Sequence, residues 1–291
     1  MDLLSRPLLS VSLLVLTVLV CEREAVASGA PGDSRQALMH AAFPKWNGRG
    51  PWIMKLPPDG PDRVEYTVAT TPQRVLAIDE SHRVLVFAGS PSDDQGNNLG
   101  GHPAGGILGA VWFVRSDGRW VRTSERDEIL ETGFFGDLGR MKPLDLGGGH
   151  QGVSIENGSC WQGLCADFLS VVEFGPERAL VLLKGEVLMS SAVDGKEGCP
   201  EALGGGTPVL KADPSPPSAK DCFDVHGKWR IRPSADLERR GDLVIRFTGT
   251  DLVDHPKTQK SSPRRIAQTL VLRYAGGVYK RVSGRNPTHP I

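Results

Sequence analysis

Short apolar runs separated by two-residue turn signals constrain this chain more than any other feature. Asp117-Gly118 separates residues 111–115 from residues 119–122, and Asn157-Gly158 follows the apolar run at 150–156. Asp-Gly and Asn-Gly between apolar runs favour a type I′ turn, because both central residues of that turn need positive φ. These turn signals therefore predict antiparallel hairpins, with turns at both dipeptides.

The same pattern continues through most of the chain. The other strand candidates are residues 74–78, 82–88, 168–174, 178–184, 228–231, 242–248, 265–274 and 278–282. Gly (35 residues) and Pro (22 residues) are abundant, which also favours turns over long helices. We therefore expect an all-β fold of about a dozen short antiparallel strands, in a sandwich or an open barrel with a short N-terminal helix.

Two segments have the pattern of short helices. The first can be capped by Asp33 or Ser34 and ends before Pro44. The second is the charged stretch 125–131, for which we expect about two helical turns. The predicted organisation is a signal peptide at 1–27, the N-terminal helix and an irregular arm at 28–62, and a single β domain at 63–291 with a Pro/Gly-rich loop at 194–219.

The N-terminus predicts export. The apolar run at 8–20 follows Arg6 and is too short to span a bilayer, but it suits the core of a signal peptide. Ala25-Val26-Ala27 has the small-x-small pattern of a cleavage site, so we expect cleavage after Ala27. Lipid anchoring at Cys21 is the less favoured alternative, because Val20 stands where a small residue is needed. No later run reaches 18 apolar residues, so we expect no membrane span in the mature chain.

Four cysteines remain after cleavage, an even number that suggests two disulfides in an exported protein. Three pairings exist, and we favour Cys160–Cys165 and Cys199–Cys222. The first pair flanks four residues that fit a hairpin loop, and the second would close the Pro/Gly-rich segment. A zinc site is the weaker alternative, because the spacing lacks the paired two-residue intervals of zinc ribbons.

The long polar segment 89–109 is the main candidate for a binding site, since loops of this length in compact domains are often functional. Asp93, Gln95 and Asn97 supply oxygens at alternate positions, as a calcium loop does, and Asp94 is a further acid of the segment. However, Asn98 and Ala104 stand where such a loop needs Gly and Glu. Calcium is therefore an alternative to a solvated loop that uses its side chains for turns.

Two histidines, His102 and His150, each follow a pair of glycines. If their strands were neighbours, both rings would converge with Asp93 or Asp94. Such a cluster could bind a transition metal or supply an acid–base pair. The alternative is that these are unrelated loop histidines, and we expect no cofactor on the sequence alone. The usual catalytic strings are absent, which favours a binding module over an enzyme.

Charge is balanced overall, with 34 basic and 34 acidic residues, but it is unevenly distributed. Residues 226–291 hold 14 Lys and Arg against 5 Asp and Glu. A basic β-face on an exported protein predicts an anionic glycan or another envelope component as partner. We expect no nucleic-acid partner outside the cytoplasm. Basic strands that simply pair with acidic ones are the alternative.

Residues 74–184 resemble a loose group of exported bacterial proteins that have no assigned activity. The resemblance rests on the strand before Gly89-Ser90, on Val111-Trp112-Phe113, and on residues 147–153 leading to Asn157-Gly158. It implies location and fold class only. We therefore expect an exported binding or envelope-associated module. The rival interpretation is an envelope hydrolase or metal-dependent enzyme that uses the 89–109 loop with His102 or His150.

Overall fold

The computed structural model describes residues 34–56, 65–192, 222–236, 238–255 and 260–289, and the single positions 199, 203 and 257. The predicted signal peptide, its cleavage site and Cys21 lie outside these residues, as does most of the 194–219 loop. Within the described residues the chain forms one helix and thirteen strands, all paired antiparallel. The all-β prediction with a short N-terminal helix is confirmed.

The first sheet is a five-stranded meander whose strands pair in chain order. Its strands are β1 (Trp52–Leu56), β2 (Tyr66–Ala77), β3 (His82–Pro91), β4 (Gly106–Ser116) and β5 (Arg119–Thr132). The turn between β4 and β5 is the predicted one, with φ of 49° at Asp117 and 74° at Gly118. Both values are positive, as a type I′ hairpin requires.

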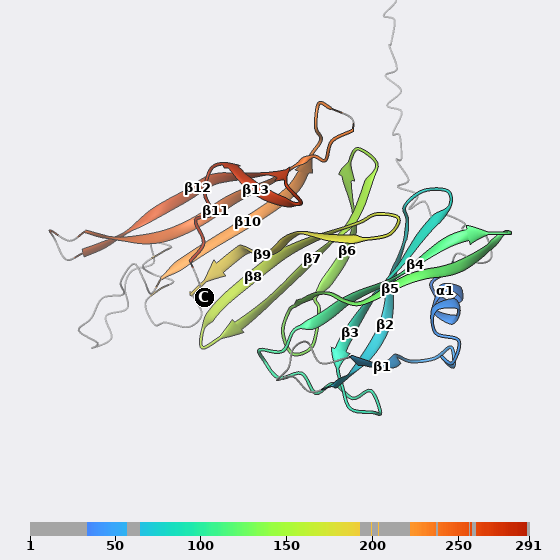
Figure 1. Cartoon of the computed structure of the whole chain (residues 1–291). Helices are drawn as coiled ribbons and strands as arrows, with labels where there is room; N and C mark the ends of the chain where they lie inside the picture. Colours follow the sequence, from blue (N-terminus) through green and yellow to red (C-terminus); the bar gives the residue numbers. More distant parts are fainter. Residues whose placement is uncertain are drawn as a thin grey trace, which may run out of the picture.

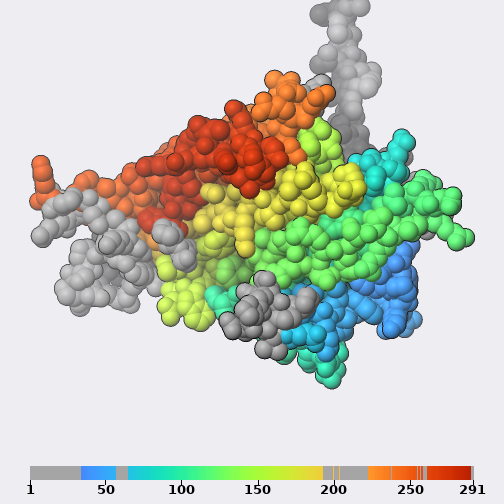
Figure 2. Space-filling model, in the orientation of Figure 1, coloured from blue at the N-terminus to red at the C-terminus, as the bar shows by residue number. Residues whose placement is uncertain are grey.

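The second sheet has eight strands in the order β13-β12-β11-β10-β9-β8-β7-β6. Its strands are β6 (Arg140–Gly147), β7 (His150–Trp161), β8 (Leu164–Phe174), β9 (Ala179–Ser191), β10 (Phe223–Arg232), β11 (Asp242–His255), β12 (Lys260–Ala275) and β13 (Val278–Ser283). In Figure 2, β9 (yellow) lies between the orange and red strands β10–β13 and the green strands.

The second sheet curls into a half-barrel because β9 and β10 pair only briefly. Their register joins three positions, 189–191 of β9 and 224–226 of β10, after which β10 crosses toward β7 and β6. One apolar cluster accordingly combines Leu146 of β6 and Leu169 of β8 with Ile245 of β11 and Leu270 of β12. At the closed end, the N–H of Gly241 donates to the carbonyl of Leu146 (2.7 Å).

The two sheets pack face to face around a core centred on Trp112 (Figure 1). Trp112 is 1% exposed and contacts Phe174 of β8, with ring centroids 6.2 Å apart. Its indole N–H donates to the carbonyl of Gly175 (2.9 Å), so the buried polar group is satisfied. Val84 and Val86 of the first sheet complete this contact with the strands β6–β9.

Helix α1 (Arg35–Ala42) covers the opposite face of the first sheet (Figure 1). The Oγ of Ser34 accepts the N–H of Ala37 (3.1 Å), which confirms the predicted N-cap. Leu38 and Met39 bury themselves among the aromatic side chains of β3 and β4. The helix therefore shields apolar surface that the second sheet does not reach.

Two local predictions are wrong. Residues 125–131 are not helical but lie inside β5, because pairing with the buried strand β4 outweighs the helix propensity of their charged side chains. Asn157-Gly158 is not a turn, because β7 continues to Trp161 and the turn falls at Gln162-Gly163. Gly158 is needed for space instead, since a Cβ there would lie 2.0 Å from Oδ1 of Asp167.

Both predicted disulfides are present, Cys160–Cys165 across the β7–β8 hairpin and Cys199–Cys222 before β10. Two disulfides indicate an oxidising, exported environment. Among the described residues, no helix is long and apolar enough to cross a membrane. The single-domain boundary at 63–291 stays a prediction, although β6–β9 and β10–β13 share one sheet.

Candidate functional site

The structure does not bring His102 and His150 together. Nε2 of His102 lies 2.8 Å from Oγ of Ser159 near the end of β7, whereas His150 begins that strand. Nine positions of extended chain separate Ser159 from His150, which is about 30 Å at 3.3 Å per residue. The ring of His102 instead packs against the exposed indole of Trp161, with centroids 4.7 Å apart.

His150 belongs to a buried ion-pair network. Its Nδ1 lies 3.0 Å from Oε1 of Glu173, a carboxylate whose side chain is only 7% exposed. Arg240, just before β11, binds the same carboxylate through Nε (2.5 Å) and through a second nitrogen (2.6 Å). A buried carboxylate held by a guanidinium fixes the β10–β11 connection against β8, which is a structural role.

The acidic residues of the 89–109 loop are used to shape the loop. Oδ1 of Asp93 accepts the backbone N–H groups of Gln95 (2.9 Å) and Asn97 (2.8 Å), and its Oδ2 accepts the Asn97 side-chain amide (2.7 Å). These hydrogen bonds, that from the Asn97 side chain first, lower the pKa of Asp93. Asp94 lies 3.5 Å from the hydroxyl of Thr67. Asp93 and Asn97 therefore meet each other, and neither meets His102.

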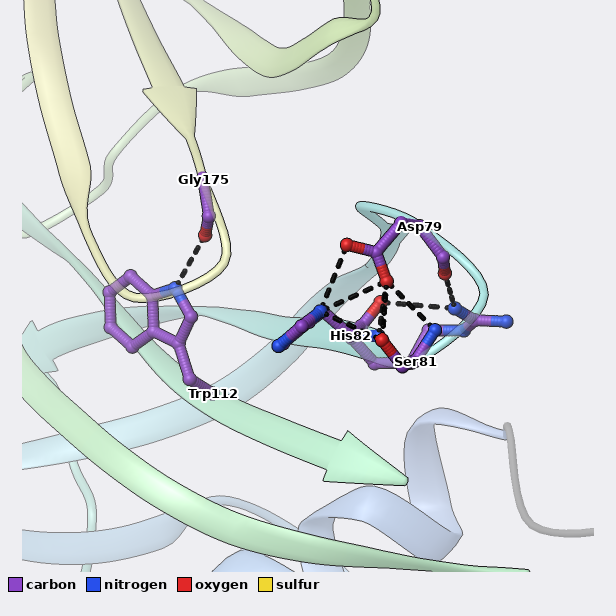
Figure 3. Close-up of polar contacts among 6 residues, drawn as sticks. Asp79, Ser81, His82, Trp112 and Gly175 are labelled. Carbon is purple, nitrogen blue, oxygen red and sulfur yellow. Dashed lines mark hydrogen bonds and ion pairs between the residues drawn. The ribbon is translucent and has the colours of Figure 1, made fainter. Parts of the chain in front are cut away.

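The turn between β2 and β3 places Asp79, Ser81 and His82 in contact, as Figure 3 shows. A catalytic triad needs the carboxylate and the hydroxyl on opposite nitrogens of the imidazole. Here the Ser81 hydroxyl (3.1 Å) and the Asp79 carboxylate (2.9 Å) both lie at Nδ1 of His82. Although partial burial opposes it, hydrogen bonding by His82 and Ser81 lowers the pKa of Asp79 to about 2. The cluster stabilises the turn.

No group of three or more His, Cys, Asp or Glu residues within the described ranges could hold a metal ion. The calcium and transition-metal alternatives thus have no supporting geometry in this part of the chain.

Basic side chains gather on the outer face of β10–β13. Residues paired directly across antiparallel strands share a face, and the register pairs Lys228 with Arg246 and Arg232 with Asp242. Asp242 also binds Arg273 of β12. Arg273 in turn pairs with Lys280 of β13. This surface, called the basic face below, consists of Lys228, Arg230, Arg232, Arg246, Arg273 and Lys280, all exposed.

Few acidic groups neutralise the basic face. Asp242 binds Arg232 (2.6 Å) and Arg273 (2.8 Å), and hydrogen bonding by Arg273 first, then Arg232, lowers its pKa to about 2. Asp224, at the far end, contacts His226 (2.9 Å). The remaining four cations make no ion pair with another described residue; they are Lys228, Arg230, Arg246 and Lys280. The face therefore carries a net positive charge.

A cleft of about 620 Å³ opens where the first half of β10 passes over β6 and β7, away from the closed end at Leu146. Its polar lining comes from β6, β7, β8 and β10, and its apolar lining is Pro143, Leu144, Leu188, Met189 and Trp229. The volume lies within the range of small-molecule sites. Neither His102 nor His150 lines it.

Glu156 at the cleft is fully engaged. Its Oε2 pairs with Arg140, and its Oε1 accepts the indole N–H of Trp229 (3.0 Å) across the curled sheet. Asp167 lies beside it, and burial first, then the charge of Glu156, raises the pKa of Asp167 while His226 opposes the change. Lys142 and Lys228 line the same cleft without a hydrogen bond or ion pair to another described residue. Apart from His226, the titratable lining of the cleft is thus three cations, Arg140, Lys142 and Lys228, against two acids, Glu156 and Asp167.

A carboxyl pair on β5 escaped the sequence analysis, because that stretch has the composition of a helix. Glu125 and Asp127 lie two positions apart on one face of the strand, and one oxygen of each is buried without a hydrogen-bond partner. Burial, followed by the neighbouring Asp127, raises the pKa of Glu125 to about 7, although Arg122 opposes this. The spacing of these two acids by two residues, which is typical of side chains on one face of a strand, was the sequence signal that could have identified the pair.

This pair predicts a pH-dependent stability. The pKa of Glu125 rises from 4.5 to about 7 on folding, so the folded chain binds more protons between these values. The free energy of unfolding should therefore fall as pH rises from about 4.5 to 7 and then level off. We expect Glu125→Gln to stabilise the protein by roughly 1–2 kcal/mol at pH 8, after discounting for solvent screening, and by much less at pH 4.5.

Urea unfolding at the two pH values measures this difference. Glu131→Gln, an exposed change on the same strand, is the matched control and should show no such pH dependence. An equal effect of Glu125→Gln at both pH values would contradict a raised pKa of Glu125 in the folded protein.

Comparison of the whole chain with family models, with curated proteins and with solved structures finds no match to any of them. The basic face and the cleft are therefore the features from which a function can be inferred.

Proposed function

We propose that this protein is an exported binding module that attaches to an anionic glycan of the cell envelope through the basic face. The observation that carries the proposal is the cross-strand register, which places cations of the four strands β10–β13 on one face, with few acids to neutralise them. An array of this kind attracts a polyanion over several repeats. Export would follow cleavage after Ala27, which agrees with the two disulfides.

The binding interpretation is better supported than the hydrolase or metal-dependent enzyme. His102 and His150 lie at opposite ends of β7, and the Asp79–Ser81–His82 cluster has the geometry of a turn. By contrast, the basic face is exposed and needs no rearrangement to meet a partner.

Retention on immobilised heparin, a sulfated polysaccharide, tests the proposal. A triple variant, Arg230→Gln, Arg246→Gln and Lys280→Gln, removes three unpaired cations from the basic face. We expect this variant to bind at least tenfold more weakly at physiological salt and to elute at lower salt, because the attraction is electrostatic.

The matched control removes the same charge elsewhere, with Lys45→Gln, Arg119→Gln and Lys184→Gln, all of which are exposed and outside the basic face. It should elute close to the unmodified protein. Equal losses in the two triple variants would mean that net charge alone governs retention, and the proposal would fail.

A further inference from the structure

We infer that the cleft between β10 and the strands β6 and β7 is a second binding site, for a small amphiphilic anion with a carboxylate or phosphate head and an apolar body. This site is separate from the proposed glycan surface, since most of its lining residues belong to β6–β9. Lys228, in the middle of β10, is the one residue that both surfaces share.

The charge of the cleft favours an anion, because its lining holds three cations, Arg140, Lys142 and Lys228, against the acids Glu156 and Asp167. Arg140 pairs with one oxygen of Glu156 and the Trp229 indole donates to the other, so the charge of this carboxylate is already offset. Lys142 on β6 lines the cleft, and Lys228 on β10, whose side chain shares the outer face with Arg246, lies at its rim. Neither lysine has a partner among the described residues. An anionic head placed between them would form charge-assisted hydrogen bonds that neither lysine has in the free protein.

The walls of the cleft require an apolar body as well. Leu144, Leu188 and Trp229 also belong to the apolar cluster inside the half-barrel, so the cleft opens onto that interior. A fully hydrophilic anion would leave this surface in water. An alkyl or aromatic group would cover it, and each buried methylene would make the free energy of binding more favourable by about 0.8 kcal/mol. The volume of about 620 Å³ accommodates both parts of such a molecule.

The curl of the second sheet forms the cleft before any ligand binds. The N–H of Trp229 reaches Glu156 three strands away, and the Cβ of any residue at 227 would collide with the carbonyl of Leu188 (2.8 Å). Gly227 therefore lets β10 lie directly on β9 at the edge of the cleft. A preformed site costs little ordering on binding.

Isothermal titration calorimetry of the full exported chain tests the inference with decyl phosphate and decanoate below their micelle concentrations. We expect saturable one-to-one binding of at least one of the two compounds. The one with the lower Kd shows whether the site prefers a phosphate or a carboxylate head. Hexyl phosphate should bind at least tenfold more weakly than decyl phosphate, because the walls contact the body. Decanol or inorganic phosphate binding as tightly as decyl phosphate would overturn the inference.

Lysine variants separate this site from the basic face. Lys142→Gln with Lys228→Gln should weaken binding of the alkyl anion about tenfold, whereas Lys184→Gln with Lys280→Gln, the same charge change outside the cleft, should leave it within twofold. All four positions are exposed, so folding should be retained. Equal losses in the two pairs would overturn the inference. Lys142→Gln alone should leave heparin retention unchanged, so the two proposals can fail independently.

Discussion

Trp112→Ala should destabilise the protein by about 3–5 kcal/mol, the largest effect we expect from a single substitution. Trp112 is 1% exposed and stands in the core where both sheets meet. Removing the indole leaves a cavity that two rigid sheets cannot close, and it leaves the carbonyl of Gly175 without its donor (Figure 3). Urea unfolding monitored by circular dichroism measures the loss.

Two companion variants make this result interpretable. Trp112→Phe keeps an aromatic ring but loses the hydrogen bond, and should cost about 1–2 kcal/mol. Trp161→Ala removes an indole that is 57% exposed, and should cost less than about 1 kcal/mol. If Trp112→Ala cost no more than Trp161→Ala, the packing of the two sheets around this residue would be wrong.

Removing the Cys199–Cys222 disulfide by a double change to Ala should cost about 3 kcal/mol, against about 2 kcal/mol for the same change at Cys160 and Cys165. The difference follows from the sequence separations, 23 residues against 5, because a longer closed loop restricts the unfolded chain more. Cys199 and Cys222 are also fully buried beside Leu252, so their loss removes packing too.

Unfolding of the two double variants under non-reducing conditions measures this order. A titration of free thiols in the unfolded, unreduced protein should first find none in the chain after cleavage at Ala27. Equal or reversed costs would show that chain entropy does not set the contribution of these bridges.

Local turn chemistry made much of the fold predictable from sequence. Asp117 and Gly118 have positive φ as expected, and the cysteine pairing followed from loop geometry. The turn predicted at Asn157-Gly158 was wrong because glycine is also used inside strands. Here Gly158 leaves space for the side chain of Asp167 on the paired strand. The prediction for residues 125–131 was wrong because their composition favours a helix. Their pairing with β4, which makes them a strand, cannot be read from the composition of the segment itself.

The cleft could not be predicted, because it depends on where β10 leaves β9. Trp229 and Glu156 are separated by 73 residues and meet only through the curl of the second sheet. The basic face was anticipated as a charge imbalance in residues 226–291, but its alignment needed the register. The alternation of Lys228, Arg230 and Arg232 with Trp229 and Ile231 was the signal that could have assigned the two faces.

Within each sheet, every strand pairs with the strand that precedes or follows it in the chain. An exported chain emerges from a translocation channel with its N-terminus first. Each strand can therefore pair with the strand before it as soon as it has emerged. Closing such short loops is fast compared with pairing distant strands. The slow steps should then be the docking of the two finished sheets and the oxidation of Cys199 with Cys222, which must wait until β10 has emerged.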